Sequence, residues 1–383
     1  MKTSLDQVSF QETRSLEEVR QSLSHQMRDR NRVGLGWLRF SCSVKYFTYW
    51  KERIEKFFRI KLRSRGKGWQ GYIESWEGGL GILIAYTPVL TQAQREAMGI
   101  KSSTNEGKMT LDIPQSALDS LTDRKHLGLW IDIFGCEDVK FTRVDIYYDD
   151  YGKIISPEVL HRSCLGGGVG VPRFTDIRDI SRYNLQTGKS MGYTVYIGSC
   201  KSDRQIRYYD KTLESEGKQD CYRMEMQDSG QYAEKFGPYM LEVLDRALQC
   251  GSVKDSVAVM RDAYKSLLKG SISFHEIPEG VSQKDLPQNW AKRSPHTWWW
   301  EEMMAGLEPA KLTLDRVEPS LQKSVAWFIN QVAPTLAVVK MVYQHYGMPF
   351  NSWFTGHIDK ASDRLGDKHL RMIEEAILTS PAY

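Results

Sequence analysis

Three short segments in the middle of the chain alternate between apolar and polar side chains, the pattern of β-strands that bury one face. They read RVDIYYD (143–149), QIRYYDK (205–211) and YRMEMQ (222–227). Because successive side chains of a strand point to opposite faces, each segment has one apolar and one polar face. If the three strands are neighbours in one sheet, their apolar faces pack against helices and their polar faces form one surface.

The polar surface would combine acids, cations and tyrosines. Its expected members are Asp145, Tyr147, Asp149, Arg207, Tyr209, Lys211, Arg223, Glu225 and Gln227. Tyr208 would point to the apolar face and serve as packing. A shift of one residue in the strand would exchange Tyr208 and Tyr209. A solvated polar face without function is the alternative interpretation.

Such a surface is suited to phosphoryl transfer at a DNA backbone. Acidic side chains on adjacent strands can hold Mg²⁺ or Mn²⁺ through oxygen ligands, and the metal polarises a phosphoryl oxygen. A tyrosine is a poor nucleophile at neutral pH because its ordinary pKa is about 10. Nearby Lys, Arg and metal charge are therefore expected to lower the pKa of Tyr209 and favour the phenolate. The covalent product would be a phosphotyrosine, which keeps the energy of the phosphodiester for rejoining.

Composition and charge favour a folded protein of the cytoplasm. Of the 383 residues, 41% are hydrophobic and 26% are charged, and the net charge is only +4. Residues 45–68 nevertheless carry nine Lys and Arg against two Glu, which predicts a local polyanion site or a solvated face. We expect no membrane partner and no signal peptide, because no apolar run approaches about 18 residues and the N-terminus is polar. The six scattered cysteines are expected to be reduced thiols.

The periodicity along the chain predicts three parts. Residues 1–32 form a polar, partly helical lead-in, and residues 33–230 form an α+β catalytic domain with an antiparallel sheet packed against helices. Residues 231–383 have a helical pattern and are expected to recognise DNA or bind a partner. The three consecutive tryptophans, Trp298, Trp299 and Trp300, fit either a core between helices or base stacking.

The strand segments resemble the replication initiation factor family, which includes rolling-circle initiators of small bacterial plasmids, relaxases of some integrative conjugative elements and filamentous-phage replication proteins. The resemblance rests on FTRVDIYYDD (141–150), YTVYIGSCKSDRQIRYYDKTLE (193–214) and YRMEMQ, in the family's order and spacing. It implies that Tyr209 is the nicking nucleophile, with Arg207 and Lys211 as phosphate contacts. It also implies metal binding by Asp145, Glu225 and Asp149. Further DNA contacts are expected at Arg143, Lys201, Arg204 and Arg223.

The resemblance further implies a rolling-circle replication initiator. Such a protein binds origin DNA that is single-stranded or extruded as a hairpin. It nicks one strand there, with Mg²⁺ or Mn²⁺, and stays attached to the 5′ phosphate. The free 3′-OH primes synthesis, a host helicase unwinds the duplex, and members often act as dimers. Two alternatives stay open. One is a relaxase of an integrative conjugative element, with the same chemistry; the other is a non-catalytic DNA-binding regulator of replication.

Overall fold

The computed structural model describes residues 31–99, 105–312 and 321–379. The chain forms two compact units, Met1–Leu314 and Asp315–Tyr383. The lead-in expected at residues 1–32 lies almost entirely outside the described residues. The unit boundary also lies well beyond residue 230, where the sequence pattern becomes helical, because the first helices after that point pack onto the sheet.

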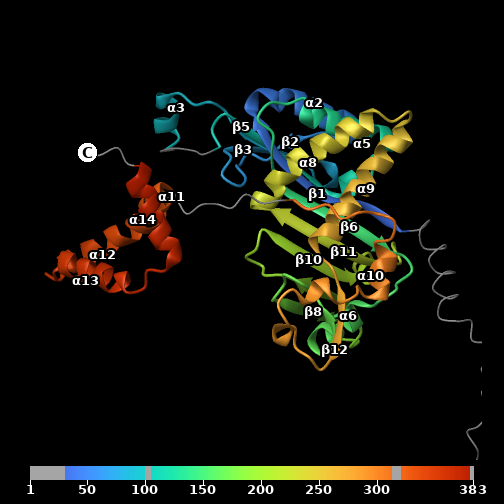
Figure 1. Cartoon of the computed structure of the whole chain (residues 1–383). Helices are drawn as coiled ribbons and strands as arrows, with labels where there is room; N and C mark the ends of the chain where they lie inside the picture. The colour runs from blue at the N-terminus through green and yellow to red at the C-terminus, as the bar shows by residue number, and fades with distance from the viewer. Residues whose placement is uncertain (1–30, 100–104, 313–320, 380–383) are drawn as a thin grey trace, which may run out of the picture. The chain divides into compact units, whose positions relative to one another are not determined.

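The first unit is built on one antiparallel sheet, which in the described residues has ten strands in the order β2-β3-β4-β5-β1-β6-β11-β10-β9-β8 (Figure 1). The strands are β1 (Arg32–Ser43), β2 (Arg63–Ser64), β3 (Glu74–Glu77), β4 (Leu83–Thr87), β5 (Lys108–Pro114), β6 (Lys140–Asp150), β8 (Ile177–Tyr183), β9 (Ser190–Ile197), β10 (Arg204–Asp210) and β11 (Tyr222–Ser229). The three segments singled out in the sequence are β6, β11 and β10, which are direct neighbours. The predicted α+β fold with an antiparallel sheet is confirmed. A separate pair, β7 (Gly167–Gly170) and β12 (His275–Glu279), forms a small second sheet.

Helices cover the apolar face of the sheet. The helices of this unit are α2 (Phe47–Phe58), α3 (Gln92–Ala97), α4 (Gln115–Leu118), α5 (Asp123–Phe134), α6 (Pro157–Leu165), α7 (Lys211–Glu214), α8 (Gly230–Leu248), α9 (Val253–Ser271) and α10 (Trp298–Met303). Helices α8 and α9 lie across the central strands (Figure 1). The side chain of Ser252 accepts a hydrogen bond from the Asp255 amide (3.1 Å) and fixes the start of α9.

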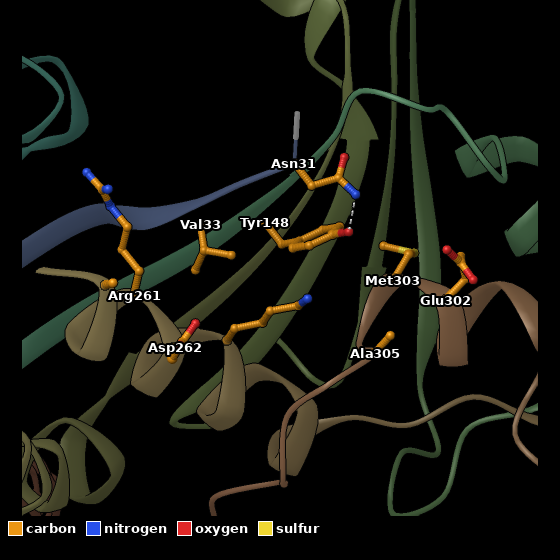
Figure 2. Close-up of a pocket in the computed structure, with 10 residues that line it drawn as sticks. Asn31, Val33, Tyr148, Arg261, Asp262, Glu302, Met303 and Ala305 are labelled. Carbon is orange, nitrogen blue, oxygen red and sulfur yellow. Dashed lines mark hydrogen bonds between the residues drawn. The ribbon is translucent and has the colours of Figure 1, made fainter. Parts of the chain in front are cut away.

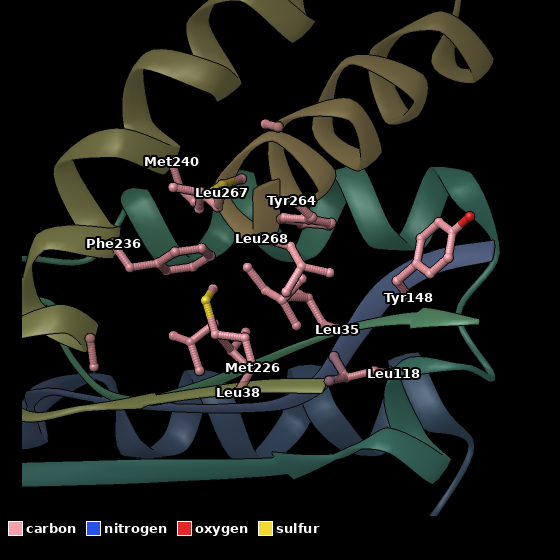
Figure 3. Close-up of a cluster of buried hydrophobic side chains, with 14 of the residues drawn as sticks. Leu35, Leu38, Leu118, Tyr148, Met226, Phe236, Met240, Tyr264, Leu267 and Leu268 are labelled. Carbon is pink, nitrogen blue, oxygen red and sulfur yellow. The ribbon is translucent and has the colours of Figure 1, made fainter. Parts of the chain in front are cut away.

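The core between the sheet and these helices is built from side chains that the strand alternation turns inward. Leu38 of β1 and Met226 of β11 meet Phe236 of α8 and Leu267 of α9, all with no exposed surface (Figure 3). Trp299 and Trp300 are buried against Phe274, whereas Trp298 is 42% exposed. Two of the three tryptophans are therefore core residues.

The second unit is helical in its described part. It contains α11 (Leu321–Trp327), a π-helical stretch (Phe328–Val332), α12 (Ala333–His345), α13 (Phe350–Ser362) and α14 (Asp367–Thr379). Tyr343 of α12 packs against Trp353 of α13, with ring centroids 5.2 Å apart. Within the described residues, no helix of either unit is both long enough and apolar enough to cross a membrane.

Candidate active site

The pairing of β6, β11 and β10 brings the predicted polar residues onto one surface. Glu225 of β11 lies between Tyr147 of β6 and Arg207 of β10 in the register. Tyr209 lies opposite Arg223, the next residue of that face. Residues directly opposite each other in an antiparallel pair share a face, so the predicted alternation is confirmed for these strands.

The two adjacent tyrosines have different surroundings. Tyr208 has no exposed surface, and its hydroxyl donates a hydrogen bond to the carbonyl oxygen of Ile155 (2.6 Å). Tyr209 lines a cavity on the polar face, and its hydroxyl donates to Oε2 of Glu225 (3.1 Å). Tyr208 is thus a core residue, and Tyr209 is the tyrosine that faces the site.

A chain of charged groups continues from Glu225. Arg207 Nη2 lies 2.5 Å from Glu225 Oε1 and 3.6 Å from Asp145 Oδ2. Arg143 grips both oxygens of Asp145 through Nε (2.9 Å) and Nη2 (2.7 Å). The Nε of Arg207 is buried and has no hydrogen-bond partner among the described residues. Because an unmade hydrogen bond of a buried cation is costly, this N–H is suited to an incoming anion.

The pKa of Tyr209 is shifted opposite to the sequence-based expectation. Burial raises it above its ordinary value, and the negative charge of Glu225 raises it further. Arg223 and Arg207 act in the other direction and are outweighed. In the protein without metal or DNA, the neighbouring arginines therefore do not bring this pKa below its ordinary value, and the expected effect of a metal stays a prediction. The phenol keeps its proton and holds it on the carboxylate of Glu225.

Asp149 and Arg223 form a closed ion pair below the site. Both are completely buried, and Arg223 contacts Asp149 through Nε (2.6 Å) and Nη2 (2.8 Å). The guanidinium also stacks on Tyr147, 3.9 Å from the ring centroid. Arg223 therefore has no exposed surface, and both oxygens of Asp149 accept its hydrogen bonds. The expected roles of Arg223 in DNA binding and Asp149 in metal binding stay predictions, and both would require this pair to open.

The other predicted DNA contacts also separate into buried and exposed groups. Arg204 is buried, bonded to both oxygens of Asp228 (2.7 and 2.6 Å) and stacked over Tyr232. Lys211 is the first residue of α7 and pairs with Glu214, with its Nζ 5.8 Å from the ring centroid of Tyr209. Lys201 is exposed in the turn between β9 and β10. Of these three cations, Lys201 is the one already open to a ligand.

The cavity around Tyr209 has a volume of about 520 Å³ and includes residues that the sequence reasoning did not connect with the site. Trp37 of β1 lies opposite Asp145 in the register, and the Arg143 guanidinium stacks on its ring, 4.4 Å from the centroid. Gly36 lies at an irregularity of the pairing between β1 and β6. A Cβ at Gly36 would lie 3.1 Å from Oε1 of Glu225 and 3.5 Å from Cβ of Asp145. The glycine therefore leaves space beside both carboxylates.

All four oxygens of Asp145 and Glu225 accept hydrogen bonds, from Arg143, Arg207 and Tyr209. Within the described residues, no group of three or more His, Cys, Asp or Glu side chains is arranged for a metal. Mg²⁺, however, is commonly bound by one or two carboxylates together with phosphate oxygens and water. Burial raises the pKa of Asp145, Arg143 opposes this shift, and the like charge of Glu225 adds to it. A metal held by these two carboxylates would therefore take the place of hydrogen bonds from Arg143, Arg207 or Tyr209.

A second cavity, of about 260 Å³, opens on the helix-covered side of the sheet (Figure 2). It is lined by Tyr148 of β6, by Arg261 and Asp262 of α9, and by Glu302 of α10. Asn31 donates a hydrogen bond to the Tyr148 hydroxyl (2.6 Å) at its edge. It shares no lining residue with the cavity around Tyr209, so the sheet separates the two.

The fold is that of a solved replication initiator. A structure titled "Structure of Rolling Circle Replication Initiator Protein from Geobacillus stearothermophilus" superposes with a TM-score of 0.50 at 16% sequence identity. The match covers 74% of this chain and 100% of that one. At this sequence identity the likeness shows the fold alone, so this chain and that solved protein share a fold.

The family is shown by the sequence match. The family model described as "Replication initiation factor" matches residues 139–350, more than half of the chain. The chain therefore belongs to the replication initiation factor family. A relative from Bacillus subtilis (strain 168), named "Putative DNA relaxase NicK", is 24% identical over 249 residues. That match covers 64% of this chain and 65% of the relative, slightly less than two thirds of its length.

Proposed function

We propose that the protein nicks and rejoins one strand of DNA, with Tyr209 as the nucleophile, and acts as a rolling-circle replication initiator. The main support is the hydrogen bond from the Tyr209 hydroxyl to Glu225, in a cavity lined by Arg143 and Arg207. Membership of the replication initiation factor family supports the DNA substrate. The names of the two related proteins, a relaxase and a rolling-circle initiator, support the nicking chemistry.

In the proposed reaction, Oη of Tyr209 attacks the phosphorus of a DNA phosphodiester. The bond from Oη to phosphorus forms as the bond from phosphorus to O3′ breaks. The phenolic proton passes to Glu225, and the leaving O3′ takes up one proton to give a free 3′-OH. One phosphodiester is exchanged for another, so the 3′-OH can reverse the reaction and rejoin the strand without a nucleotide cofactor. Because the pKa of Tyr209 is raised, a proton acceptor in contact with the hydroxyl is required.

Phosphate binding is assigned to the arginines of the cavity. Arg143 and Arg207 present guanidinium forks, which match the geometry of phosphate oxygens. The Nε of Arg207 is buried and unpartnered among the described residues, so its N–H could bind a phosphate oxygen once the side chain turns toward the cavity. Asp145 and Glu225 would hold Mg²⁺ or Mn²⁺, which would neutralise charge that develops on the phosphoryl oxygens. Lys201, exposed at the β9–β10 turn, would add a contact to the backbone.

Partner binding is assigned to the helical part of the chain. The family match runs to residue 350 and so includes α11 and α12 of the second unit. Recognition of the origin, contact with a host helicase and dimer formation would fall on the helices after residue 231. Deletion of residues 315–383 should then reduce the preference for the origin. Full specificity in the truncated protein would remove this assignment.

A relaxase is the second candidate, because the Bacillus subtilis relative is named as one. Both proteins would make the same phosphotyrosine, and they differ in the fate of the nicked strand. Copying of the nicked replicon in cells indicates an initiator, whereas transfer of the nicked strand to a recipient indicates a relaxase. A non-catalytic regulator would bind DNA and form no covalent product.

The test is a comparison of wild type, Tyr208→Phe and Tyr209→Phe. Each protein is mixed with supercoiled plasmid and single-stranded oligonucleotides of its own replicon, in Mg²⁺ or Mn²⁺, and a denaturing gel detects the protein–DNA adduct. We expect an adduct and relaxation in wild type and Tyr208→Phe, and neither in Tyr209→Phe. Loss of the adduct in Tyr208→Phe alone would assign the nucleophile to Tyr208. No adduct in any variant, with DNA binding intact, would favour the regulator.

A further inference from the structure

An aromatic side chain lies on the polar face one strand away from Tyr209. In the pairing of β10 with β9, Tyr209 lies opposite Thr194 and Arg207 lies opposite Tyr196. Tyr196 is therefore a diagonal neighbour of Tyr209, about 7–8 Å away across the pair. Both side chains line the same cavity. A group bound at Tyr209 thus has the ring of Tyr196 within reach.

A cationic side chain of the neighbouring outer strand, β8, packs against the ring of Tyr196. Arg178 of β8 lies opposite Tyr196, and its guanidinium stacks on the ring, 4.7 Å from the centroid. Arg178 is exposed and Tyr196 is half-buried. One face of the ring is thus supported by Arg178, as in arginine–aromatic pairs that bind bases.

The polar face of β8 and β9 forms a strip of surface beside Tyr209. The charge of this strip suits a nucleic-acid backbone. Arg178, Ile180 and Arg182 alternate onto the polar face of β8, while Asp179 between them turns to the other face, 3.9 Å from His161. Ile180 and Arg182 line the cavity around Tyr209 together with Met191 of β9. Strand β8 therefore offers two cations and apolar surface on this face, with its own acid directed away; Glu214 and Glu225 line the cavity near Tyr209.

We propose that Tyr196, supported by Arg178, is a subsite for an unpaired nucleobase that flanks the phosphate attacked by Tyr209. This proposal rests on the proposed nicking function and names the side chains that would take one base of the single strand. In a duplex, base faces are covered by stacking on their neighbours, whereas an unpaired base can place its π-face on the ring. The open face of β9 and β8 then carries the strand away from the nucleophile.

The experiment measures base-dependent binding without cleavage. All proteins carry Tyr209→Phe and are full length. Fluorescence anisotropy at one fixed salt concentration gives Kd for a labelled 12-residue oligothymidylate and for a 12-unit abasic phosphodiester of the same charge. The ratio of the abasic Kd to the oligothymidylate Kd reports base contacts separately from phosphate contacts. Tyr196→Ala should reduce this ratio by about 5- to 150-fold, the effect of losing one base–aromatic stack.

Two controls separate stacking from damage to the fold. Tyr196→Phe keeps the ring and should keep the ratio within about twofold. Tyr49→Ala removes an exposed tyrosine of α2, which packs on the other face of the sheet through Trp50 and Phe40, and should leave the ratio unchanged. If Tyr196→Ala lowers the thermal midpoint, Arg178→Ala, at an exposed position, gives a second measurement and should also reduce the ratio.

The outcomes also distinguish this proposal from the nicking function. An unchanged ratio in Tyr196→Ala and Arg178→Ala, or an equal loss of affinity for both oligonucleotides, would overturn the base subsite. A reduced ratio in Tyr196→Ala that Tyr196→Phe restores would support it. If wild type forms no adduct while the ratio behaves as expected, the base subsite stands and the nicking function falls.

Discussion

Asp149→Asn tests whether this carboxylate serves the fold or a metal. In the folded protein the Arg223 guanidinium has no exposed surface, and its two short contacts to Asp149 are charge-assisted. Asn keeps the shape but removes the negative charge, so Arg223 would remain buried and uncompensated. Breaking a buried pair in this way destabilises a protein by about 3–5 kcal/mol. Nη1 of Arg223 already lacks a partner among the described residues, so few other contacts could compensate for the lost charge of Asp149.

The assay is urea unfolding followed by far-UV circular dichroism, in EDTA. We expect Asp149→Asn to lose about 3–5 kcal/mol of unfolding free energy without any metal present. The paired replacement Asp149→Leu with Arg223→Met should recover most of this loss, because neither charge is then buried alone. Asp145→Asn is the matched control, and its effect should be smaller because the Arg143 side chain is 23% exposed. A loss below about 1 kcal/mol for Asp149→Asn, or a less stable double variant, would refute the ion-pair argument.

Further predictions concern the reaction, the buried tyrosine and pH. Glu225→Gln should slow adduct formation by about 10²–10⁴-fold, the usual effect of removing a proton acceptor, and EDTA should abolish the adduct until Mg²⁺ or Mn²⁺ is restored; a gel time course checks both. Tyr208→Phe should cost about 1–3 kcal/mol of unfolding free energy, because the Ile155 carbonyl loses its buried donor, and an unchanged urea midpoint would contradict this. Burial lowers the pKa of His126 to about 4, so the unfolded state takes up the proton first and stability should fall as the pH drops from about 6.5 to 4. His126→Gln should reduce this pH-dependent loss of unfolding free energy by about 1–3 kcal/mol, as measured by urea unfolding at each pH.

The part of the site that could be predicted from the sequence is the part that depends on strand alternation. RVDIYYD, QIRYYDK and YRMEMQ each carry a period of two, and this period alone places Tyr209 and Glu225 on one face and Tyr208 on the other. Their adjacency is indicated by the resemblance, whose motifs follow in the same order and spacing. The order of the three strands in the sheet, β6-β11-β10, does not follow from the alternation.

The partners of the charged groups could not be predicted, because they depend on distant pairings and on burial depth. Gly36 reaches the carboxylates only through the pairing of β1 with β6, more than 100 residues apart in sequence. The alternation also assigns Arg223 to the same face as Glu225, but it does not show that this guanidinium is covered and bonded to Asp149. The direction of the pKa shift of Tyr209 is missed for the same reason. Counting nearby cations leaves out burial, which acts in the opposite direction.

The position of Tyr209 in an internal strand decides which molecule has to move. Strand β10 is bonded to β11 on one side and to β9 on the other, and both ladders include Tyr209. The backbone of Tyr209 therefore cannot shift without breaking the sheet, and the tyrosine can adjust only by rotation of its side chain. In the proposed reaction, the DNA would have to be brought to this fixed point. The same rigidity would keep a covalently held 5′ end in place, so that a returning 3′ end would meet it in an unchanged geometry.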